Sequence, residues 1–359
     1  MSSGENKSLT LEEVRDKARD KLKGICGVYR ICDGADNRIC QGKSYGAPLG
    51  IGGIGSGASF HNNIKALEKI RLKMKLVSQD FDANTNFTFF GKDISMPIMG
   101  ASVSGVNSFG GDMIITEQDF CHAVVQGCKD AGTIGWRGDT FTYSLETPFG
   151  LNAIAKAGGG GVKIVKPREQ EVIISFFKKA KEVGATAVGV DVDGCGSYMM
   201  AKHNKPVFRK SPEDIKELVA ATSLPVIIKG IMCTEDAVAA VEAGASAVVV
   251  SDHGGRVMDH TPGTAEVLPG VAEAISGKAM VLVDGGIRTG YDVLKMLGLG
   301  ADAVLIGRDI VRGAVGGGAE GVRLQMAFLG NTLAKAMKMV DCRTLKDITP
   351  DIIINPWDP

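Results

Sequence analysis

Eight short apolar runs alternate with amphipathic stretches over residues 97–307. The runs are largely apolar and mostly end at glycine or a polar residue, which is typical of strands buried on both faces. The expected strands are Pro97–Ala101, Gly132–Gly135, Val162–Val165, Ala187–Val192, Pro225–Lys229, Ala247–Ser251, Met280–Asp284 and Ala303–Gly307. The expected helices are Glu117–Lys129, Asn152–Lys156, Glu169–Val183, Pro212–Ala221, Thr234–Ala243, Thr264–Ile275 and Gly290–Leu297. This alternation predicts a closed α/β barrel of the (β/α)8 type, rather than an open sheet.

The chain is expected to have three parts: a cap segment over residues 1–84, the barrel over 85–349 and a tail over 350–359. Two helical patterns, Thr10–Leu22 and Asn62–Lys75, flank a stretch rich in glycine and cysteine. The apolar spacing at Leu67 and Ile70 indicates packing, so we expect this segment to cover one barrel mouth. A disordered tail is the alternative. A long helical segment, Gly313–Lys338, ends the barrel.

The charge balance argues against nucleic-acid and membrane partners. The sequence has 41 basic and 41 acidic residues, so no net field attracts a polyanion. No apolar run is long enough to span a bilayer, and the N-terminus lacks a signal-peptide core, which predicts a cytoplasmic protein. The eight cysteines are then expected to be reduced. Cys26, Cys32 and Cys40 lack the paired C-x-x-C spacing of metal sites, so no metal is expected.

Two consecutive turns near the end of the barrel predict a phosphate site. Asp284-Gly285-Gly286-Ile287-Arg288 follows the seventh strand, and Gly307-Arg308 follows the eighth. These two loops commonly bind phosphate in (β/α)8 barrels through backbone N–H groups. The glycines permit close approach, and both arginines can donate charge-assisted hydrogen bonds.

Three ionisable residues end neighbouring strands, where the catalytic mouth of a barrel lies. His253 follows the sixth strand within Ser251–Arg256, and an imidazole there can accept a hydroxyl proton near neutral pH. Lys229 ends an apolar strand and must point into a polar mouth, because an unpaired buried ammonium is too costly. Asp191 ends the fourth strand and is a candidate to orient His253.

Pro225–Gly230, Ser251–Arg256, Asp284–Arg308 and Cys342-Arg343-Thr344-Leu345 together resemble the FMN-dependent α-hydroxy-acid dehydrogenase and oxidase family, which includes glycolate and lactate oxidases. The resemblance implies a flavoprotein oxidoreductase that binds FMN and a small 2-hydroxy or 2-oxo acid, and it suggests a tetramer. His253 would take the hydroxyl proton while hydride goes to flavin N5, Asp191 would hold the imidazolium, Arg256 would bind the carboxylate, and Lys229 would lie by flavin N1 and O2. The implied cofactor contacts are Ala101, Ser102, Lys163, Lys229, Ser251, Asp284, Gly286, Arg288, Gly307 and Arg308.

The chain also departs from the family pattern. Asp252 stands where the family has asparagine, and residues 193–198 lack the family's second arginine, for which Lys202 and Arg209 are candidate substitutes. Gly53 and Val165 stand near the positions of two substrate-facing tyrosines, and Lys163 at that of a flavin-contacting glutamine. These departures leave open another FMN barrel enzyme, such as a type 2 isopentenyl diphosphate isomerase-like protein. A flavin-binding module without catalysis is the third possibility.

Overall fold

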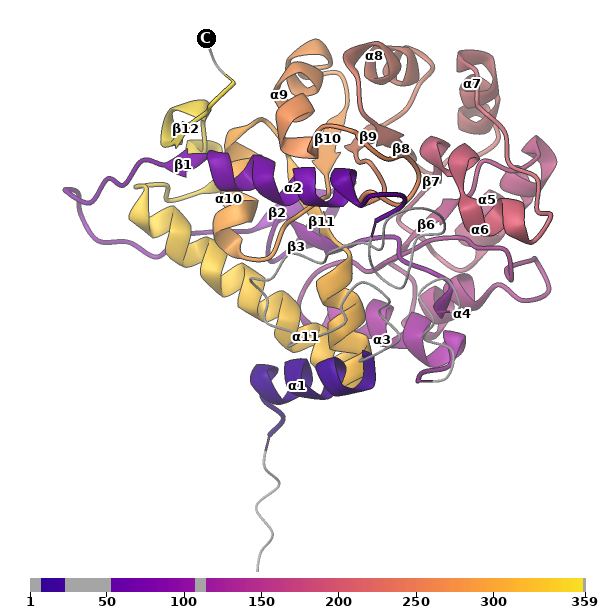
Figure 1. Cartoon of the computed structure of the whole chain (residues 1–359), viewed down its shortest axis with the longest axis horizontal. Coiled ribbons are helices and arrows are strands. Elements are labelled where there is room, and N and C mark those ends of the chain that lie inside the picture. The colour runs from indigo at the N-terminus through magenta and orange to yellow at the C-terminus, as the bar shows by residue number, and fades with distance from the viewer. Residues whose placement is uncertain (1–7, 23–52, 107–113, 358–359) are drawn as a thin grey trace, which may run out of the picture.

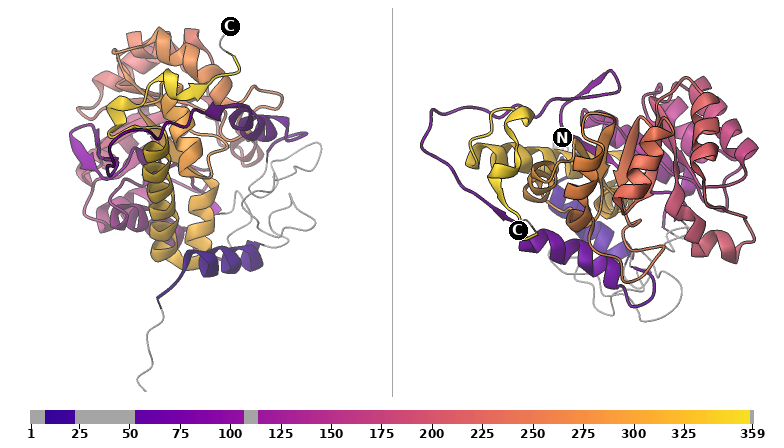
Figure 2. Two further views of the ribbon diagram at one scale, coloured as in Figure 1. Left: turned by 90° about the vertical axis from the view of Figure 1, so that its left-hand side faces the viewer. Right: turned by 90° about the horizontal axis from the view of Figure 1, so that it is seen from above.

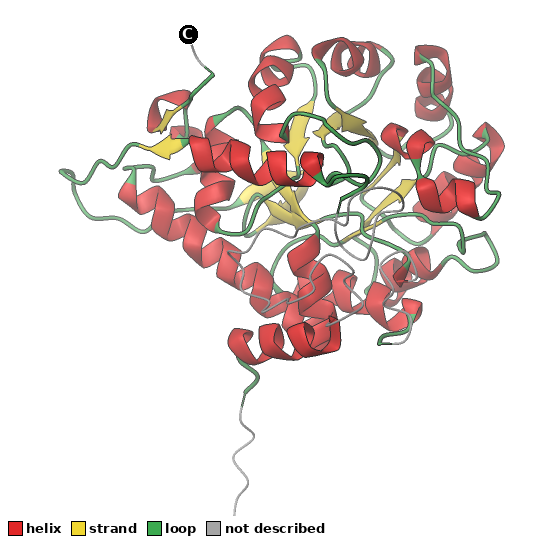
Figure 3. Ribbon diagram, in the orientation of Figure 1, coloured by secondary structure: helices red, strands yellow, loops and turns green. Residues whose placement is uncertain are grey.

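The centre of the molecule is a ring of eight parallel strands. A computed structural model describes residues 8–22, 53–106 and 114–357 of the chain. The ring consists of β4 (Ile98–Gly100), β5 (Trp136–Arg137), β6 (Val162–Val165), β7 (Ala187–Asp191), β8 (Val226–Ile231), β9 (Ala247–Val250), β10 (Met280–Val283) and β11 (Ala303–Ile306). Figure 3 shows these strands in yellow, with the helices around them. The predicted barrel is thereby confirmed.

The strand order β4-β11-β10-β9-β8-β7-β6-β5 follows the chain around the ring. The ring closes between its ends through a parallel bridge from Gly100 to Gly135, where Gly100 N donates to the Ile134 carbonyl at 2.9 Å. A side chain at Gly135 would not fit, because its Cβ would lie 2.8 Å from the Val124 carbonyl oxygen. Glycine therefore lets a helix pack directly against the seam of the barrel.

Helices cover the outside of the ring (Figures 1 and 2). They are α3 (Glu117–Asp130), α4 (Phe149–Lys156), α5 (Gln170–Glu182), α7 (Pro212–Ala220), α8 (Thr234–Glu242), α9 (Thr264–Ala274), α10 (Gly290–Gly298) and α11 (Arg308–Met339). Short helical turns η2 (Val192–Gly196) and α6 (Tyr198–Lys202) follow β7. Local sequence fixes several starts: Ser211 and Asp214 form a capping box at α7, and Thr289 and Asp292 form one at α10.

Alternate residues of each strand point into the barrel, as the two-residue period of a strand requires. The inward side chains form one apolar cluster that includes Trp136, Ile164 and Leu305. A hairpin of β2 (Phe87–Phe89) and β3 (Lys92–Ile94) adds apolar side chains to the same cluster. The barrel centre is therefore a packed core, and chemistry is confined to the strand ends.

The N-terminal helices pack on the barrel at different places. Helix α1 (Leu11–Leu22) lies on α11, with Val14 buried against the kink where Gly318 has a φ of 60° (Figure 1). Helix α2 (Ala58–Lys69) packs against α9 at the mouth formed by the carboxyl ends of the strands. Of the described part of the expected cap segment, α2 and the turn before it lie at this mouth, whereas α1 lies on α11.

Two sequence expectations are corrected by the structure. The second strand is Trp136–Arg137 rather than Gly132–Gly135, because buried Arg137 stacks on the Phe120 ring and lacks the apolar signature of a core strand. The turn η3 (Leu345–Asp347) ends the expected barrel segment. The first residues of the expected tail are folded: they form the turn η4 (Pro350–Ile352) and then β12 (Ile353–Ile354), which pairs antiparallel with β1 (Arg71–Leu72). Among the described residues, no helix has the length and apolar character needed to cross a membrane.

Candidate active site

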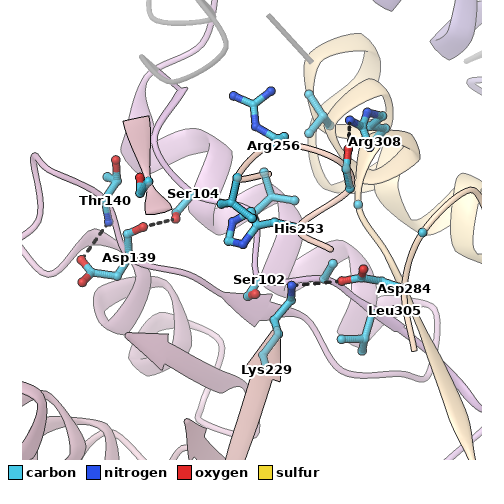
Figure 4. Close-up of a pocket in the computed structure, with 18 of the residues that line it drawn as sticks. Ser102, Ser104, Asp139, Thr140, Lys229, His253, Arg256, Asp284, Leu305 and Arg308 are labelled. Atoms are coloured by element: carbon cyan, nitrogen blue, oxygen red, sulfur yellow. Dashed lines mark hydrogen bonds and ion pairs between the residues drawn. The ribbon is translucent and has the colours of Figure 1, made fainter. Parts of the chain in front are cut away.

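A pocket opens at the carboxyl ends of the strands, the end where (β/α)8 enzymes carry their chemistry. It encloses about 1240 Å³ of space, counting the solvent at its mouth. Figure 4 shows Ser104, Asp139 and Thr140 on one side and Asp284, Leu305 and Arg308 on the other, with His253 between them. The pocket therefore receives residues from both halves of the barrel.

Most of the residues expected at the site do line this pocket. They are Ala101, Ser102, Lys229, His253, Arg256, Asp284, Gly286, Arg288, Gly307 and Arg308. Ser251 and Asp191 lie directly behind the lining, where both are buried and bonded to residues that line it. Cys26, Cys32 and Cys40 fall outside the described residues.

A buried polar network joins the ends of three neighbouring strands. Lys229 Nζ donates to Ser251 Oγ at 2.7 Å and lies 3.2 Å from Asp284 Oδ2, while Ser251 Oγ donates to Asp284 Oδ1 at 2.7 Å. Burial opposes the ammonium, but the carboxylates of Asp284, Asp193 and Asp191 raise the pKa of Lys229 above its ordinary value. Lys229 is therefore an ammonium in the pocket floor, paired with the Asp284 carboxylate.

The loop after β9 holds His253 in a sparsely populated backbone conformation. His253 has a φ of 58°, and Gly254 and Gly255 continue the turn at 64° and 77°. A β-carbon at Gly255 would lie 2.5 Å from the Phe60 backbone nitrogen, so α2 packs against this turn only because the residue is glycine. A strained non-glycine residue at a pocket is a mark of functional sites.

The partner of the His253 ring is Asp193, two residues beyond the one expected. His253 Nδ1 lies 3.1 Å from both carboxylate oxygens of Asp193, whereas Asp191 Oδ2 lies 3.9 Å from Nε2. Burial opposes ionisation of Asp193, but His253 and the nearby ammonium groups lower its pKa, so the carboxylate is charged and Nδ1 must donate. Nε2 of the neutral ring is then left with a lone pair.

Asp191 instead bonds to Lys166, a residue that sequence reasoning did not single out. Lys166 Nζ donates to Asp191 Oδ2 and lies 3.4 Å from His253 Nε2. Burial and the Lys166 ammonium lower the pKa of His253, which keeps the ring neutral near pH 7. The alternation of side chains along the strand could have predicted this position, because Lys166 falls on the same inward face as Val162 and Ile164.

Lys163 was expected to contact the flavin, but the structure places its side chain away from the pocket. Its Nζ donates to the Gly138 carbonyl and lies 5.1 Å from the Tyr143 ring centroid, outside the barrel. Burial lowers the pKa of Lys163 to about 8. Val165 has the same outward register and does not line the pocket. Shifting the alignment of a strand by one residue moves each side chain to the opposite face. Such a shift explains why Lys163 and Val165 were both assigned to the pocket.

The loops after β10 and β11 offer a cationic site at the start of α11. Arg288 and Arg308 both line the pocket; Arg308 donates to the Gly254 carbonyl at 2.8 Å and its guanidinium lies 4.2 Å from the Phe60 ring centroid. Two guanidinium groups beside a helix N-terminus suit a phosphate, and Lys229 suits the electron-rich edge of a flavin ring. The donor set therefore fits FMN.

The opposite side of the pocket differs more from expectation. Arg168 forms a bidentate pair with Asp139, at 2.7 and 3.0 Å, which holds Asp139 beside Ser104. Lys202 and Arg209, the expected substitutes for the missing arginine, are exposed and do not line the pocket. Lys166 is the cation that this half contributes to the pocket lining.

A histidine with a positive φ, bonded to a carboxylate, lies at the same barrel mouth as two arginines beside a helix N-terminus, and this arrangement suits a flavin-dependent oxidoreductase on a (β/α)8 barrel. The sequence matches the FMN-dependent dehydrogenase family over residues 50–208 and 196–355, and the chain belongs to this family. It is 30% identical to 4-hydroxymandelate oxidase of Amycolatopsis orientalis, covering 82% of this chain and 89% of that protein. It is 29% identical to L-lactate oxidase of Roseobacter sp. (strain GAI101), over 84% and 88%. A crystal structure of mandelate oxidase with (S)-2-phenylpropionate superimposes with a TM-score of 0.76 at 28% identity, covering 95% and 96%.

Family membership makes FMN the cofactor and the chain an oxidoreductase. The expected family, fold and cofactor are thereby confirmed, and the isomerase-like alternative is not favoured. The roles of individual residues stay predictions.

Proposed function

We propose that the protein oxidises a small 2-hydroxy acid to the corresponding 2-oxo acid, with His253 as the base. The observation that carries this proposal is the Nδ1 contact to Asp193 at 3.1 Å, which leaves Nε2 as the proton acceptor. The hydroxyl proton would pass to Nε2, and bound FMN would accept the two electrons and the hydrogen from C2 as hydride. Curated relatives named for oxidation of lactate and 4-hydroxymandelate support this substrate class.

The other polar groups would bind and stabilise. Arg256 lines the pocket three residues after His253, and its planar guanidinium suits a carboxylate. Arg288, Arg308 and the Gly307 turn would hold the FMN phosphate, with Ala101 and Ser102 against the cofactor. Lys229 would stabilise the negative charge that appears on the flavin ring during reduction. Cytoplasmic location and a homo-oligomer stay predictions.

The test is anaerobic stopped-flow absorbance of the FMN-loaded protein with glycolate, lactate, mandelate and 4-hydroxymandelate. We expect the wild type to be reduced by at least one of these acids. His253→Ala should keep its FMN and be reduced about 10²–10⁴-fold more slowly, as is typical for loss of a general base. Arg256→Lys is the comparison variant: it keeps the charge but loses the bidentate fork, so substrate binding should weaken. Reduction of His253→Ala at the wild-type rate would exclude this mechanism.

A further inference from the structure

Lys166 lies in the pocket with no role in the scheme above. It follows β6 in the inward register of Val162 and Ile164, and its ammonium is held by Asp191. The side chains of Lys166 and Asp191 are only 8% and 7% exposed, so the pair is a built part of the site rather than a surface contact. A buried ion pair beside a pocket contributes little to the stability of the fold, because the cost of desolvating the two charges offsets much of their attraction. Another role is therefore expected for it.

The ammonium faces the nitrogen that would act as base. Lys166 Nζ lies 3.4 Å from His253 Nε2, on the side of the ring opposite to Asp193. A hydroxyl that gives its proton to Nε2 must bring its oxygen within hydrogen-bond reach of that nitrogen. The same oxygen then comes close to the Lys166 ammonium, which has three donors: one is bonded to Asp191 Oδ2, one faces His253 Nε2, and the third can serve the substrate oxygen.

We propose that Lys166 binds the oxygen on C2 of the substrate: Asp191 holds the ammonium, and the ammonium donates a hydrogen bond to the 2-hydroxyl or 2-oxo oxygen. The two carboxylates then have different roles: Asp193 orients the base His253, and Asp191 orients the donor Lys166. The inference rests on the proposed function and adds a specificity determinant to it. Lys166 would select acids that carry an oxygen at C2, and Arg256 would hold the carboxylate.

The first experiment compares ligands that differ only in this oxygen. Pyruvate and propionate, 2-oxobutyrate and butyrate, and phenylglyoxylate and phenylacetate form matched pairs that do not reduce the flavin. Their dissociation constants follow from the change in FMN absorbance on titration of the oxidised holoprotein. We expect Lys166→Met to weaken binding of the 2-oxo member by about tenfold or more, as for loss of a charged hydrogen bond, with the unsubstituted acid unchanged.

Two further variants make this result specific. Lys166→Arg keeps the charge and the donors, so it should retain a preference for the 2-oxo acid. Lys163→Met is the matched control, because it removes a buried lysine of the same strand whose side chain points out of the barrel. It should leave both dissociation constants unchanged. Equal weakening of both acids in Lys166→Met would overturn the proposal, since Lys166 would then hold the carboxylate or only the fold.

The second experiment measures His253 directly by NMR titration of histidine-labelled holoprotein. The chain has five histidines, and His253→Ala assigns the signal. The charged groups around the ring are Lys166 after β6, Asp191 on β7, Asp193 in η2, Lys229 on β8, and Asp252 and Arg256 in its own loop, with Arg308 bonded to Gly254 beside it.

Because the Lys166 ammonium lowers the pKa of His253, Lys166→Met should raise that pKa, and Lys166→Arg and Lys163→Met should not. The acid limb of flavin reduction should move to higher pH in the same variant. An unchanged His253 pKa in Lys166→Met would overturn the proposed contact even if no acid in the panel binds. Absence of binding or reduction by every acid, with the pKa shift present, would instead refute the proposed substrate class and also the role of Lys166 toward it.

Discussion

The two halves of the barrel mouth differ in the polar contacts that they contain and in how well the family pattern predicted them. The flavin half, at the ends of β8 to β11 apart from the turn His253–Arg256, contains a network in which Lys229, Ser251 and Asp284 bond to one another. The substrate half, at the ends of β6 and β7 together with that turn, carries paired charges that the family pattern did not predict, such as Lys166 with Asp191. In the proposed function, the first half binds FMN and the second binds the acid.

This difference indicates which positions of a barrel can be substituted without loss of the fold. Strand register fixes which residues face the mouth, and it is the same in both halves, so substitution at an inward position changes the chemistry without disturbing the core. Lys166 and Lys229 both follow apolar inward residues, yet Lys166 pairs with Asp191 beside His253 and Lys229 pairs with Asp284. We therefore expect variants of the two halves to separate substrate turnover from cofactor retention.

The largest effect should come from the substrate half. Asp193→Asn should slow flavin reduction about 10²–10⁴-fold while FMN content stays unchanged, because the amide cannot hold the imidazolium that forms. Asp191→Asn should have a smaller effect, mainly on substrate affinity, since Asp191 contacts Lys166 rather than Nδ1. Anaerobic stopped-flow reduction gives both values. A larger loss in Asp191→Asn than in Asp193→Asn would restore the original assignment of Asp191 as the orienting carboxylate.

The flavin half should respond in the opposite way. Arg308→Glu should weaken FMN binding about 10²-fold or more, because it replaces a guanidinium with a carboxylate where a phosphate would lie. Arg323→Glu is the matched control: it makes the same charge change on α11, at a half-exposed position paired with Glu320. Equilibrium dialysis with FMN fluorescence measures the affinity. If both variants bound FMN like the wild type, Arg308 would not belong to the phosphate site.

The sequence predicted the flavin half well for a physical reason. Its strands are continuous apolar runs, and its turns contain glycines and arginines that few other sites require in this order. Asp284, Arg288, Gly307 and Arg308 could therefore be placed by local pattern alone. Lys229 could be placed at the mouth because it ends an uninterrupted apolar strand, where an unpaired buried ammonium is too costly.

The substrate half was harder because one of its strands and the side of another do not follow the local pattern. Buried Arg137 interrupts the apolar pattern of β5, whereas β6 was predicted with its observed bounds and only the side on which Lys163 points was wrong. The Lys163 ammonium lies over two aromatic rings, and such a tertiary contact has no signature in the local sequence. Asp193 lies in a turn after β7, where the two-residue period of the strand no longer applies. Its contact with His253 depends on how two loops fold toward each other.

The smallest expected effect concerns Asp252, the departure from the family pattern that lies next to His253 in the sequence. Asp252 has the outward register and accepts a hydrogen bond from Asn63 of α2 at 2.8 Å, so it lies behind the mouth. Burial, with the Asp284 carboxylate nearby, raises the pKa of Asp252 to about 6. The folded state therefore keeps a proton that the unfolded chain releases near pH 4, and this group lowers stability as the pH rises from about 4 to about 6.

Asp252→Asn removes this cost because the amide is neutral and its oxygen can still accept from Asn63. We expect the free energy of unfolding in urea, at fixed excess FMN, to rise by about 1–3 kcal/mol at pH 7 and to be unchanged at pH 4. Asp259 gives a control of opposite sign: it accepts from the Ser56 backbone at 2.6 Å, which helps to hold its pKa below the ordinary value although burial opposes this. Asp259→Asn should therefore destabilise at pH 7, and less at pH 3. Destabilisation by Asp252→Asn at pH 7 would mean that the carboxylate itself holds α2 on the flavin half, and the departure would then be structural.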